Sequence, residues 1–355
     1  MNLDPSTDLV TLLRAVVDVE SVSGNEKRLA DLVEEMLRAQ PHLEVARDGD
    51  CVVARTRLGR GQRVLIAGHL DTVPVTGNLP STVEETPDGV VIHGRGTVDM
   101  KGGVAVALKL ACELDQPRFD VTWVFYDHEE VDASLNGLGR LAGNRPDLLE
   151  ADFAVLMEPT GARVEGGCQG TIRIRITAEG RAAHSARSWM GKNAIHGLAG
   201  VLARLASHEP KRIEVEGLEY REGLNAVRIS GGVAGNVIPS QAWGEINYRF
   251  APDKSADEAL GYLKEVFEGY SFEVTDIAPA ARPGLDRPLA QDFVDAVGGE
   301  AFPKYGWTDV SRFSALGIPA VNYGPGDSSL AHRDDERCPA EHLRTCIDGL
   351  RRWLA

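Results

Sequence analysis

The sequence lacks the patterns that mark several broad classes of protein. Its five cysteines are odd in number and no pair has the Cys-x-x-Cys spacing, so neither a disulfide framework nor a zinc ribbon is indicated. No apolar run approaches the ~20 residues that a membrane-spanning helix needs. The first residues have neither the basic flank nor the apolar core of a secretion signal. We therefore expect a cytoplasmic protein with reduced thiols.

An excess of basic charge is also missing. The net charge of −15 repels phosphate backbones and anionic lipids, which argues against nucleic acid or a membrane surface as a partner. A small anionic substrate stays compatible with this charge, because local arginines can bind it. The chain has 355 residues, which exceeds the usual length of one domain and predicts two.

Two common catalytic or binding motifs are absent. No Gly-x-Ser-x-Gly elbow occurs and no cysteine stands beside an obvious base, which argues against a serine or cysteine hydrolase. The loop 94–103 approximates the dinucleotide-binding pattern Gly-x-Gly-x-x-Gly, but Asp99 occupies the position of the third glycine. A carboxylate there would face the pyrophosphate, so we do not expect nucleotide binding.

The most informative stretch that is present runs from Val64 to Pro74. Four apolar residues precede Gly68 and predict a strand buried on both faces, which ends at His69. Residues two apart on a strand point to the same side, so His69 and Asp71 can reach one place. Open α/β sheets bind their ligands at this carboxyl end of the strands.

Further acidic residues follow other predicted strands or lie in the glycine loop. They are Asp99, the pair Glu129 and Glu130 after the apolar run 121–126, and Glu158 after the run 153–157. Taken singly, each is explained by a helix cap or a solvated turn. Together at one sheet edge they would repel one another unless a metal ion neutralised them. We therefore predict a cation site there.

The hydrophobic pattern changes after Gly170. Residues 171–177 alternate strictly between apolar and polar, which is typical of a sheet with one face in water. Buried-strand and helix patterns resume near the carboxyl end. The predicted fold is α/β, with a mixed sheet sandwiched by helices in a catalytic domain of residues 1–170 and 281–355. Residues 171–280 are predicted to form an inserted α+β domain that serves as a lid and for dimerisation.

These motifs resemble those of the dinuclear-zinc deacylases and carboxypeptidases, a family that includes desuccinylases, acetylornithine deacetylases and aminoacylases. The matching positions occur in the same order over nearly the whole chain: His69-Leu-Asp71, Gly94 to Gly103 with Asp99, Glu129-Glu130, Glu158-Pro-Thr, and His332 after Gly-Pro-Gly. The segments 164–171, 183–189, 235–239 and 304–309 are most similar to the desuccinylase branch of the family.

The resemblance implies a role for each matching residue. One metal would be bound by His69 and Glu158, the other by Glu130 and His332, with Asp99 bridging them. Asp71 would hold the His69 ring, and Glu129 would be the general base. The residues implied for the inserted domain are His184 for the oxyanion, often in the neighbouring subunit's site, and Asn236 and Arg249 for the substrate carboxylate. His128, between Asp127 and Glu129, is left without a role.

The function implied is hydrolysis of a small N-acyl amino acid by two divalent ions, zinc or alternatively cobalt or manganese. The desuccinylase-like segments imply N-succinyl-LL-2,6-diaminopimelate as the substrate and a homodimer through the inserted domain. An acetylornithine deacetylase, another N-acyl-amino-acid deacylase and a dipeptidase are the alternatives within the family. A binding protein that has kept the scaffold and lost catalysis is the alternative of another class.

Overall fold

The computed structural model describes residues 3–355, which form two compact units. Among the described residues, the first unit comprises 3–166, Pro283–Phe302 and Thr308–Ala355. The second comprises Gly167–Arg282 and Pro303–Trp307, and so interrupts the first in sequence. Met1 and Asn2, which open the predicted catalytic domain, lie outside the described residues. None of the helices in the described part of the chain is both long enough and apolar enough to cross a lipid bilayer.

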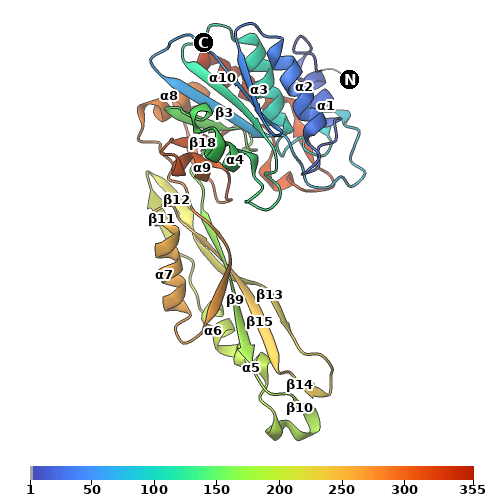
Figure 1. Cartoon of the computed structure of the whole chain (residues 1–355), viewed down its shortest axis with the longest axis vertical. Coiled ribbons are helices and arrows are strands. Elements are labelled where there is room, and N and C mark those ends of the chain that lie inside the picture. The colour runs from blue at the N-terminus through green and yellow to red at the C-terminus, as the bar shows by residue number, and fades with distance from the viewer. Residues whose placement is uncertain (1–2) are drawn as a thin grey trace. The chain divides into compact units, whose positions relative to one another are not determined.

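An eight-stranded mixed sheet forms the centre of the first unit (Figure 1). Its four middle strands are parallel, in the order β6-β3-β7-β18, and the pairs β1–β2, β2–β6 and β18–β8 are antiparallel. The strands, in spatial order, are β1 (Glu44–Asp48), β2 (Cys51–Arg55), β6 (Asp120–Tyr126), β3 (Arg63–His69), β7 (Phe153–Leu156), β18 (Ala320–Asn322), β8 (Val164–Gly166) and β17 (Ala301–Pro303).

Helices cover both faces of this sheet, because its middle strands are apolar on both sides. Val64 and Ile66 of β3 belong to one large core with helices α1, α2, α3, α8 and α10, whereas Leu65 and Ala67 are equally buried but face away from that core. Helices α4 and α9 contact the strands β2, β7 and β18. The helices are α1 (Leu9–Val17), α2 (Lys27–Arg38), α3 (Lys101–Glu113), α4 (Gly137–Asn144), α8 (Pro288–Val297), α9 (Val310–Ala315) and α10 (Ala340–Leu354).

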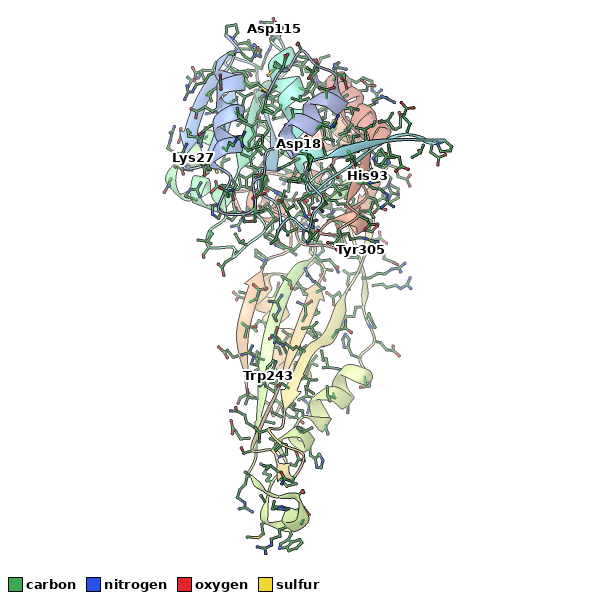
Figure 2. The ribbon with its side chains drawn as sticks, turned by 90° about the vertical axis from the view of Figure 1, so that its right-hand side faces the viewer. Asp18, Lys27, His93, Asp115, Trp243 and Tyr305 are labelled. Carbon is green, nitrogen blue, oxygen red and sulfur yellow. The ribbon has the colours of Figure 1, made fainter. Side chains whose placement is uncertain are left out.

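A smaller antiparallel sheet of three strands, in the order β19-β5-β4, completes the first unit. Its strands are β4 (Thr82–Thr86), β5 (Gly89–His93) and β19 (Arg337–Pro339), and His93 is labelled in Figure 2. Because Arg337 pairs with His93, this sheet joins the start of the glycine loop to the segment after His332. Two 3-10 turns, η1 (Pro146–Leu148) and η3 (Ser328–Leu330), also belong to this unit.

The second unit is built on a four-stranded antiparallel sheet in the order β13-β15-β9-β16. The apolar side chains of residues 171–177 pack against helices on one face of this sheet. The polar side chains of the same segment lie on the other face, together with Trp243, which pairs with Thr177 from the neighbouring strand (Figure 2). The elements are β9 (Gly170–Glu179), β10 (Ala183–His184), η2 (Ser185–Met190), α5 (Ala194–Gly197), α6 (Ala199–Ala206), β11 (Arg212–Val215), β12 (Leu218–Arg221), β13 (Gly223–Gly231), β14 (Val237–Ile238), β15 (Gln241–Phe250), α7 (Ala256–Val266) and β16 (Phe272–Ala278).

The predicted α/β fold with an inserted α+β domain is confirmed. The second unit, Gly167–Arg282, begins and ends within four residues of the predicted insertion, and it also includes the separate segment Pro303–Trp307. Its aromatic side chains anchor it there: the indole nitrogen of Trp307 donates to the carbonyl of Pro279 at 3.1 Å, and the Tyr305 hydroxyl to that of Glu219 at 3.4 Å. The pattern of polar and apolar residues around this segment did not predict that it packs with the second unit.

Candidate metal centre

The ends of three neighbouring parallel strands bring the predicted metal-binding residues of the first unit together. His69 is the last residue of β3, Glu158 lies two residues after β7, and Glu130 lies four residues after β6. Because β6, β3 and β7 run parallel and side by side, their carboxyl ends share one sheet edge. Two loops reach the same edge and add Asp99 and His332.

Three groups of three residues have ligand atoms that lie within 4.8 Å of one another, and two of these groups share Asp99. His69, Asp99 and Glu158 form the first group, and Asp99, Glu130 and His332 form the second. The two carboxylate oxygens of Asp99 divide between them: Oδ1 lies 3.1 Å from His69 Nε2, and Oδ2 lies 3.2 Å from His332 Nε2. Asp99 is therefore placed to bridge two ions.

The donor set fits a pair of divalent metal ions. Each group offers one imidazole nitrogen and two carboxylates, a combination that suits zinc and tolerates cobalt or manganese. Ligand atoms at ~2.0–2.2 Å from one tetrahedral ion lie roughly 3.3–3.6 Å apart. The distance from His332 Nε2 to Glu130 Oε2 is 3.0 Å, so a small movement would admit an ion.

The electrostatics of this cluster show how much negative charge it gathers. Hydrogen bonds to Asp99 and Glu130 raise the pKa of His332 to about 10. Burial by itself lowers the pKa of His69, but Asp71 and Asp99 outweigh it and raise that pKa well above its usual value. Both shifts have one cause: the carboxylates gathered here favour a nearby positive charge, which divalent cations would supply.

Glu129 lies beside the two groups that share Asp99 but is a member of neither. One of its carboxylate oxygens lies within 4.8 Å of ligand atoms of His69 and Glu130. Burial raises the pKa of Glu129 well above its usual value, and the neighbouring carboxylates of Asp309 and Glu158 add to the increase. A carboxyl group with such a pKa, next to a metal centre, is suited to taking and returning a proton.

Asp71 does more than the sequence indicated. The ring nitrogen Nδ1 of His69 lies 3.0 Å from the backbone oxygen of Asp71 and 3.5 Å from its carboxylate. The two carboxylate oxygens instead accept the backbone N–H groups of Glu129 and Glu130, each at 3.0 Å, and the Ser23 hydroxyl at 2.7 Å. With His69 these bonds outweigh burial and lower the pKa of Asp71 to about 2. Asp71 therefore fixes the Glu129–Glu130 turn as well as the histidine.

His128 lies directly before the Glu129–Glu130 turn, and its contacts help to hold that turn in place. Its backbone has a φ of 57°, and its ring nitrogen Nδ1 lies 2.7 Å from a carboxylate oxygen of Asp127. Its backbone N–H donates to the buried carboxylate of Glu26 at 3.2 Å. Arg140 also binds Asp127, so a small polar network lies behind the glutamate pair. The sequence left His128 without a role, because its partners Glu26 and Asp127 are identified only by the fold.

Two glycines allow the elements around Glu158 to approach closely. A side chain at Gly103, in the first turn of α3, would lie 2.3 Å from the carbonyl oxygen of Met157. A side chain at Gly324, after β18, would lie 2.2 Å from the same oxygen. Such distances are far inside van der Waals contact, so only glycine at both positions lets α3 and the 324–326 loop enclose the end of β7.

The remaining predicted residues lie in the second unit, where they fall at two different places. His184 and Asn236 are neighbours, since Ser185 N donates to the Asn236 carbonyl at 2.9 Å and β10 pairs with β14. The Nδ1 atom of His184 accepts the N–H of Ala186 at 3.1 Å, which leaves Nε2 as the hydrogen donor of the neutral ring. Arg249 lies opposite Thr171, eight residues along β15 from the Gln241–Glu179 end near β10. That span is about 26 Å at ~3.3 Å per residue.

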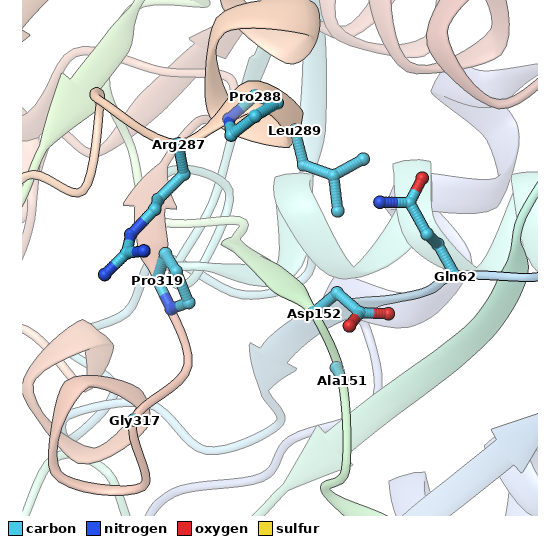
Figure 3. A pocket seen from close by; sticks show the side chains of 8 residues that line it. All are labelled: Gln62, Ala151, Asp152, Arg287, Pro288, Leu289, Gly317 and Pro319. Atoms are coloured by element: carbon cyan, nitrogen blue, oxygen red, sulfur yellow. The ribbon is translucent and has the colours of Figure 1, made fainter.

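The opposite edge of the sheet carries a pocket of ≈ 380 Å³ that lacks this chemistry (Figure 3). It is lined by proline, leucine and glycine residues, with Arg287 and the single carboxylate of Asp152. Asp152 already accepts the N–H of Arg63 at 2.8 Å. With no second titratable acid to pair with Asp152 in its lining, the pocket offers no group of metal ligands.

The sequence is similar to known proteins over nearly its whole length. Residues 65–355 match the model of peptidase family M20/M25/M40. A candidate succinyl-diaminopimelate desuccinylase of Mycobacterium tuberculosis, DapE, is 54% identical over 99% of both chains. The succinyl-diaminopimelate desuccinylase of Corynebacterium glutamicum is 46% identical over 99% of this chain and 98% of its own.

Solved structures share the fold at much lower identity. A tripeptidase of Staphylococcus aureus superposes with a TM-score of 0.79 at 21% identity, covering 100% of this chain and 98% of its own. A dinuclear metal-binding peptidase of Bacillus subtilis superposes with a TM-score of 0.70 at 16% identity, covering 97% and 96%. These similarities extend over both units of the chain.

Proposed function

The chain belongs to peptidase family M20/M25/M40, and from this membership we propose that it hydrolyses the amide bond of N-succinyl-LL-2,6-diaminopimelate with water. The products are succinate and LL-2,6-diaminopimelate. The observation that carries the proposal is the full-length similarity to two desuccinylases together with the bridged carboxylate–histidine groups. The enzyme is a metal-dependent amidohydrolase of diaminopimelate and lysine biosynthesis.

We assign two divalent ions, zinc in the first place, to the residues of the two groups. His69 and Glu158 would hold one ion, Glu130 and His332 would hold the other, and Asp99 would contribute a carboxylate oxygen to each. When bound, such a pair polarises a carbonyl group and makes water nucleophilic at neutral pH. The support is the ligand chemistry of the groups and the dinuclear centre of the related B. subtilis peptidase.

Glu129 is the proposed general base. Its backbone is held by Asp71, and its carboxyl group lies beside both ligand groups. It takes a proton from the attacking water and delivers it to the amide nitrogen as the C–N bond breaks. The raised pKa suits the second half of this exchange, in which the acid must give the proton up to a leaving amine.

His184, Asn236 and Arg249 are proposed to bind the substrate. His184 offers its Nε2 hydrogen to the oxyanion of the tetrahedral intermediate, and Asn236 and Arg249 bind carboxylate groups. A small substrate cannot span the about 26 Å of strand between Arg249 and the His184 region. One substrate therefore does not contact both Arg249 and His184, and we assign His184 to the substrate of a neighbouring subunit.

The partner is a second copy of this chain, joined through the second unit as a homodimer. β13 is an outer strand whose residues from Asn225 onward are exposed, so its backbone can pair with another strand. Val227 and Ile229 on this strand are 56% and 52% exposed, and Leu202 of the adjacent helix α6 is 40% exposed. Light scattering of the wild type and of Ile229→Lys tests this arrangement, since a buried lysine pair would leave monomers.

The cytoplasm is the proposed site of the reaction. All five cysteines are free thiols, and four of them, Cys51, Cys168, Cys338 and Cys346, are buried. Free buried thiols of this kind suit a reducing compartment.

Turnover of N-succinyl-LL-2,6-diaminopimelate by chelated protein, before and after zinc is added, tests the function. We expect activity that depends on zinc and disappears in Glu129→Gln while zinc is still bound. N-acetylornithine serves as the competing substrate. Preferential hydrolysis of the acetylated substrate would reassign the enzyme within the family, and zinc binding without hydrolysis of either would favour a silent binding protein.

A further inference from the structure

Arg95 and Glu336 form a buried ion pair beside the metal centre and are not themselves placed as ligands. The two side chains are 2% and 1% exposed, and Arg95 NH1 lies 2.9 Å from Glu336 Oε2. Buried charges of this kind are retained only when their hydrogen bonds are well satisfied. Here those bonds go to loops that carry the proposed ligands.

Arg95 connects three of these loops through its guanidinium group. Nε donates to the carbonyl of Pro74 at 3.2 Å, in the loop that follows His69 and Asp71. NH1 donates to the carbonyl of Arg333 at 3.0 Å, the residue directly after His332. Arg95 itself belongs to the glycine loop that leads to Asp99. One side chain thereby fixes the spacing of three ligand-bearing segments.

Glu336 completes the connection from the other side. Its Oε1 atom accepts the backbone N–H groups of Val98 at 2.9 Å and of Asp99 at 3.1 Å. Its backbone oxygen accepts the N–H of Gly94 at 3.1 Å, where the strands β5 and β19 come together. The bridging residue Asp99 is therefore held at its own backbone by a residue four positions after His332.

The two proposed metal sites depend on this pair to different degrees. His69 and Glu158 are almost fully buried; His69 is the last residue of β3 and Glu158 lies two residues after β7, so the large sheet itself positions them. His332 lies outside any helix or strand, has a φ of 65° and keeps 53% of its side chain exposed. Apart from its own contacts with Asp99 and Glu130, its position depends on its neighbours along the chain, and the partly buried bond from Arg95 to the Arg333 carbonyl holds the next residue.

We propose that Arg95 and Glu336 are a positioning pair that holds the His332 loop against Asp99 and thereby sets the affinity of the second metal ion. The inference rests on the two-ion centre of the proposed function and does not depend on the identity of the substrate. Removing a residue that hydrogen-bonds to a metal-ligand segment typically weakens metal affinity by about 10–100-fold.

The test is a stepwise titration of chelated, full-length protein with Zn²⁺ by calorimetry, repeated with Co²⁺ and followed by visible absorption. The variants are Arg95→Met, Arg95→Lys and the double variant Arg95→Met/Glu336→Gln. The double variant leaves no uncompensated buried charge, and glutamine keeps an oxygen that can accept the N–H groups of Val98 and Asp99. It therefore remains informative if Arg95→Met alone does not fold.

Glu222→Gln provides a matched control in the second unit. The Glu222 side chain is also buried, accepts the backbone N–H of Ala251 at 2.9 Å and pairs with Lys254. It resembles Glu336 in burial, in a backbone donor and in a cationic partner, but it holds no proposed metal ligand. A general loss of stability should appear in both variants, whereas a change confined to the second ion should appear in the Arg95 and Glu336 variants alone.

We expect the dissociation constant of the second ion to increase by about 10–100-fold in the Arg95 variants and the double variant, with that of the first ion within about threefold of wild type. Arg95→Lys should lie between Arg95→Met and wild type. Unchanged affinity for both ions, an equal loss at both, or the same loss in Glu222→Gln would overturn the proposal. Wild-type protein that binds fewer than two ions would overturn it together with the metal centre. Hydrolysis is measured separately, so failure to cleave the succinylated substrate would affect only the substrate assignment.

Discussion

Carboxylates at the two ends of the central parallel strands have opposite surroundings. At the amino end, the carboxylate of Asp120 accepts the N–H groups of Leu58 at 2.8 Å and Arg60 at 3.0 Å, and the hydroxyl of Thr56 at 3.0 Å. At the carboxyl end, Asp99, Glu130 and Glu158 face one another and two histidines. A buried acid that backbone donors satisfy supports the fold, whereas acids that face each other store repulsion that a metal ion relieves.

This contrast also distinguishes two acids at the functional end. Asp71 resembles Asp120, because backbone N–H groups surround it and its pKa is lowered to about 2. Glu129, in the same cluster, has its pKa raised by burial and by neighbouring carboxylates. The fold thus places the charged Asp71 against the backbone of Glu129, the acid that can exchange protons. Two acids with such different pKa values suit general acid–base chemistry.

The largest expected effect tests the proton-exchanging acid. Glu129→Gln should lower kcat by about 10²–10⁴-fold, because the amide can neither accept the proton of water nor deliver it to the leaving nitrogen. Asp120→Asn at the other end should leave kcat unchanged. Steady-state kinetics with zinc-loaded protein measure both, and metal content verifies that the centre is intact. Comparable losses of kcat in the two variants would remove the functional distinction between the ends.

Metal binding should relieve the repulsion at the carboxyl end. At a free zinc concentration 100 times the dissociation constant, the folded state should gain about 2.7 kcal/mol, which thermal unfolding with and without chelator detects as a higher Tm. Asp99→Asn removes the bridging charge and should lose most of this gain. Asp120→Asn should show the full gain, since its side chain lies at the opposite end. An equal gain in Asp99→Asn would show that zinc stabilises the protein at another place.

Replacing Asp71, which holds the Glu129–Glu130 turn, should affect activity less than replacing Glu129. Asp71→Asn cannot accept both backbone N–H groups with charged oxygens, so the Glu129–Glu130 turn loosens. We expect metal affinity or kcat to fall by about 10–100-fold. Ser23→Ala, which removes only the 2.7 Å hydroxyl contact to Asp71, is the matched milder change. A larger loss in Ser23→Ala than in Asp71→Asn would show that the Asp71 charge does not position the turn.

The smallest expected effect concerns stability and its dependence on pH. Although burial opposes it, the N–H groups of Leu58 and Arg60 and the Thr56 hydroxyl keep the pKa of Asp120 below its usual value. Asp120→Asn should cost about 1–2 kcal/mol of unfolding free energy at pH 7. A lowered folded-state pKa gives stability that is present above ~3.9 and is lost as pH falls through the folded value. Chemical denaturation from pH 7 to pH 3 should therefore show the difference between variant and wild type shrinking below about pH 4.

The candidate site was largely predictable because its members follow strong local signals. His69 and Glu158 end buried strands, and Asp99 interrupts a glycine loop, so spacing and strand order alone bring them to one edge. Arg95 and Glu336 carry no such signal. They are 241 residues apart in the chain, and only the pairing of β5 with β19 makes them partners. The same holds for Glu26, whose contact with the turn at His128 spans 102 residues.

The amino-acid sequence by itself determined the two-part α/β and α+β organisation, the family, and the residue types at the metal centre, because these depend on hydrophobic period and on short motifs. The tertiary structure alone decided which carboxylates are satisfied by backbone donors and which face one another. It also decided that Asp71 supports the glutamate turn, and that the two-stranded sheet carrying His184 lies near the end of β15 that is distant from Arg249. These features depend on hydrogen bonds between distant segments, and no local pattern in the chain records such contacts.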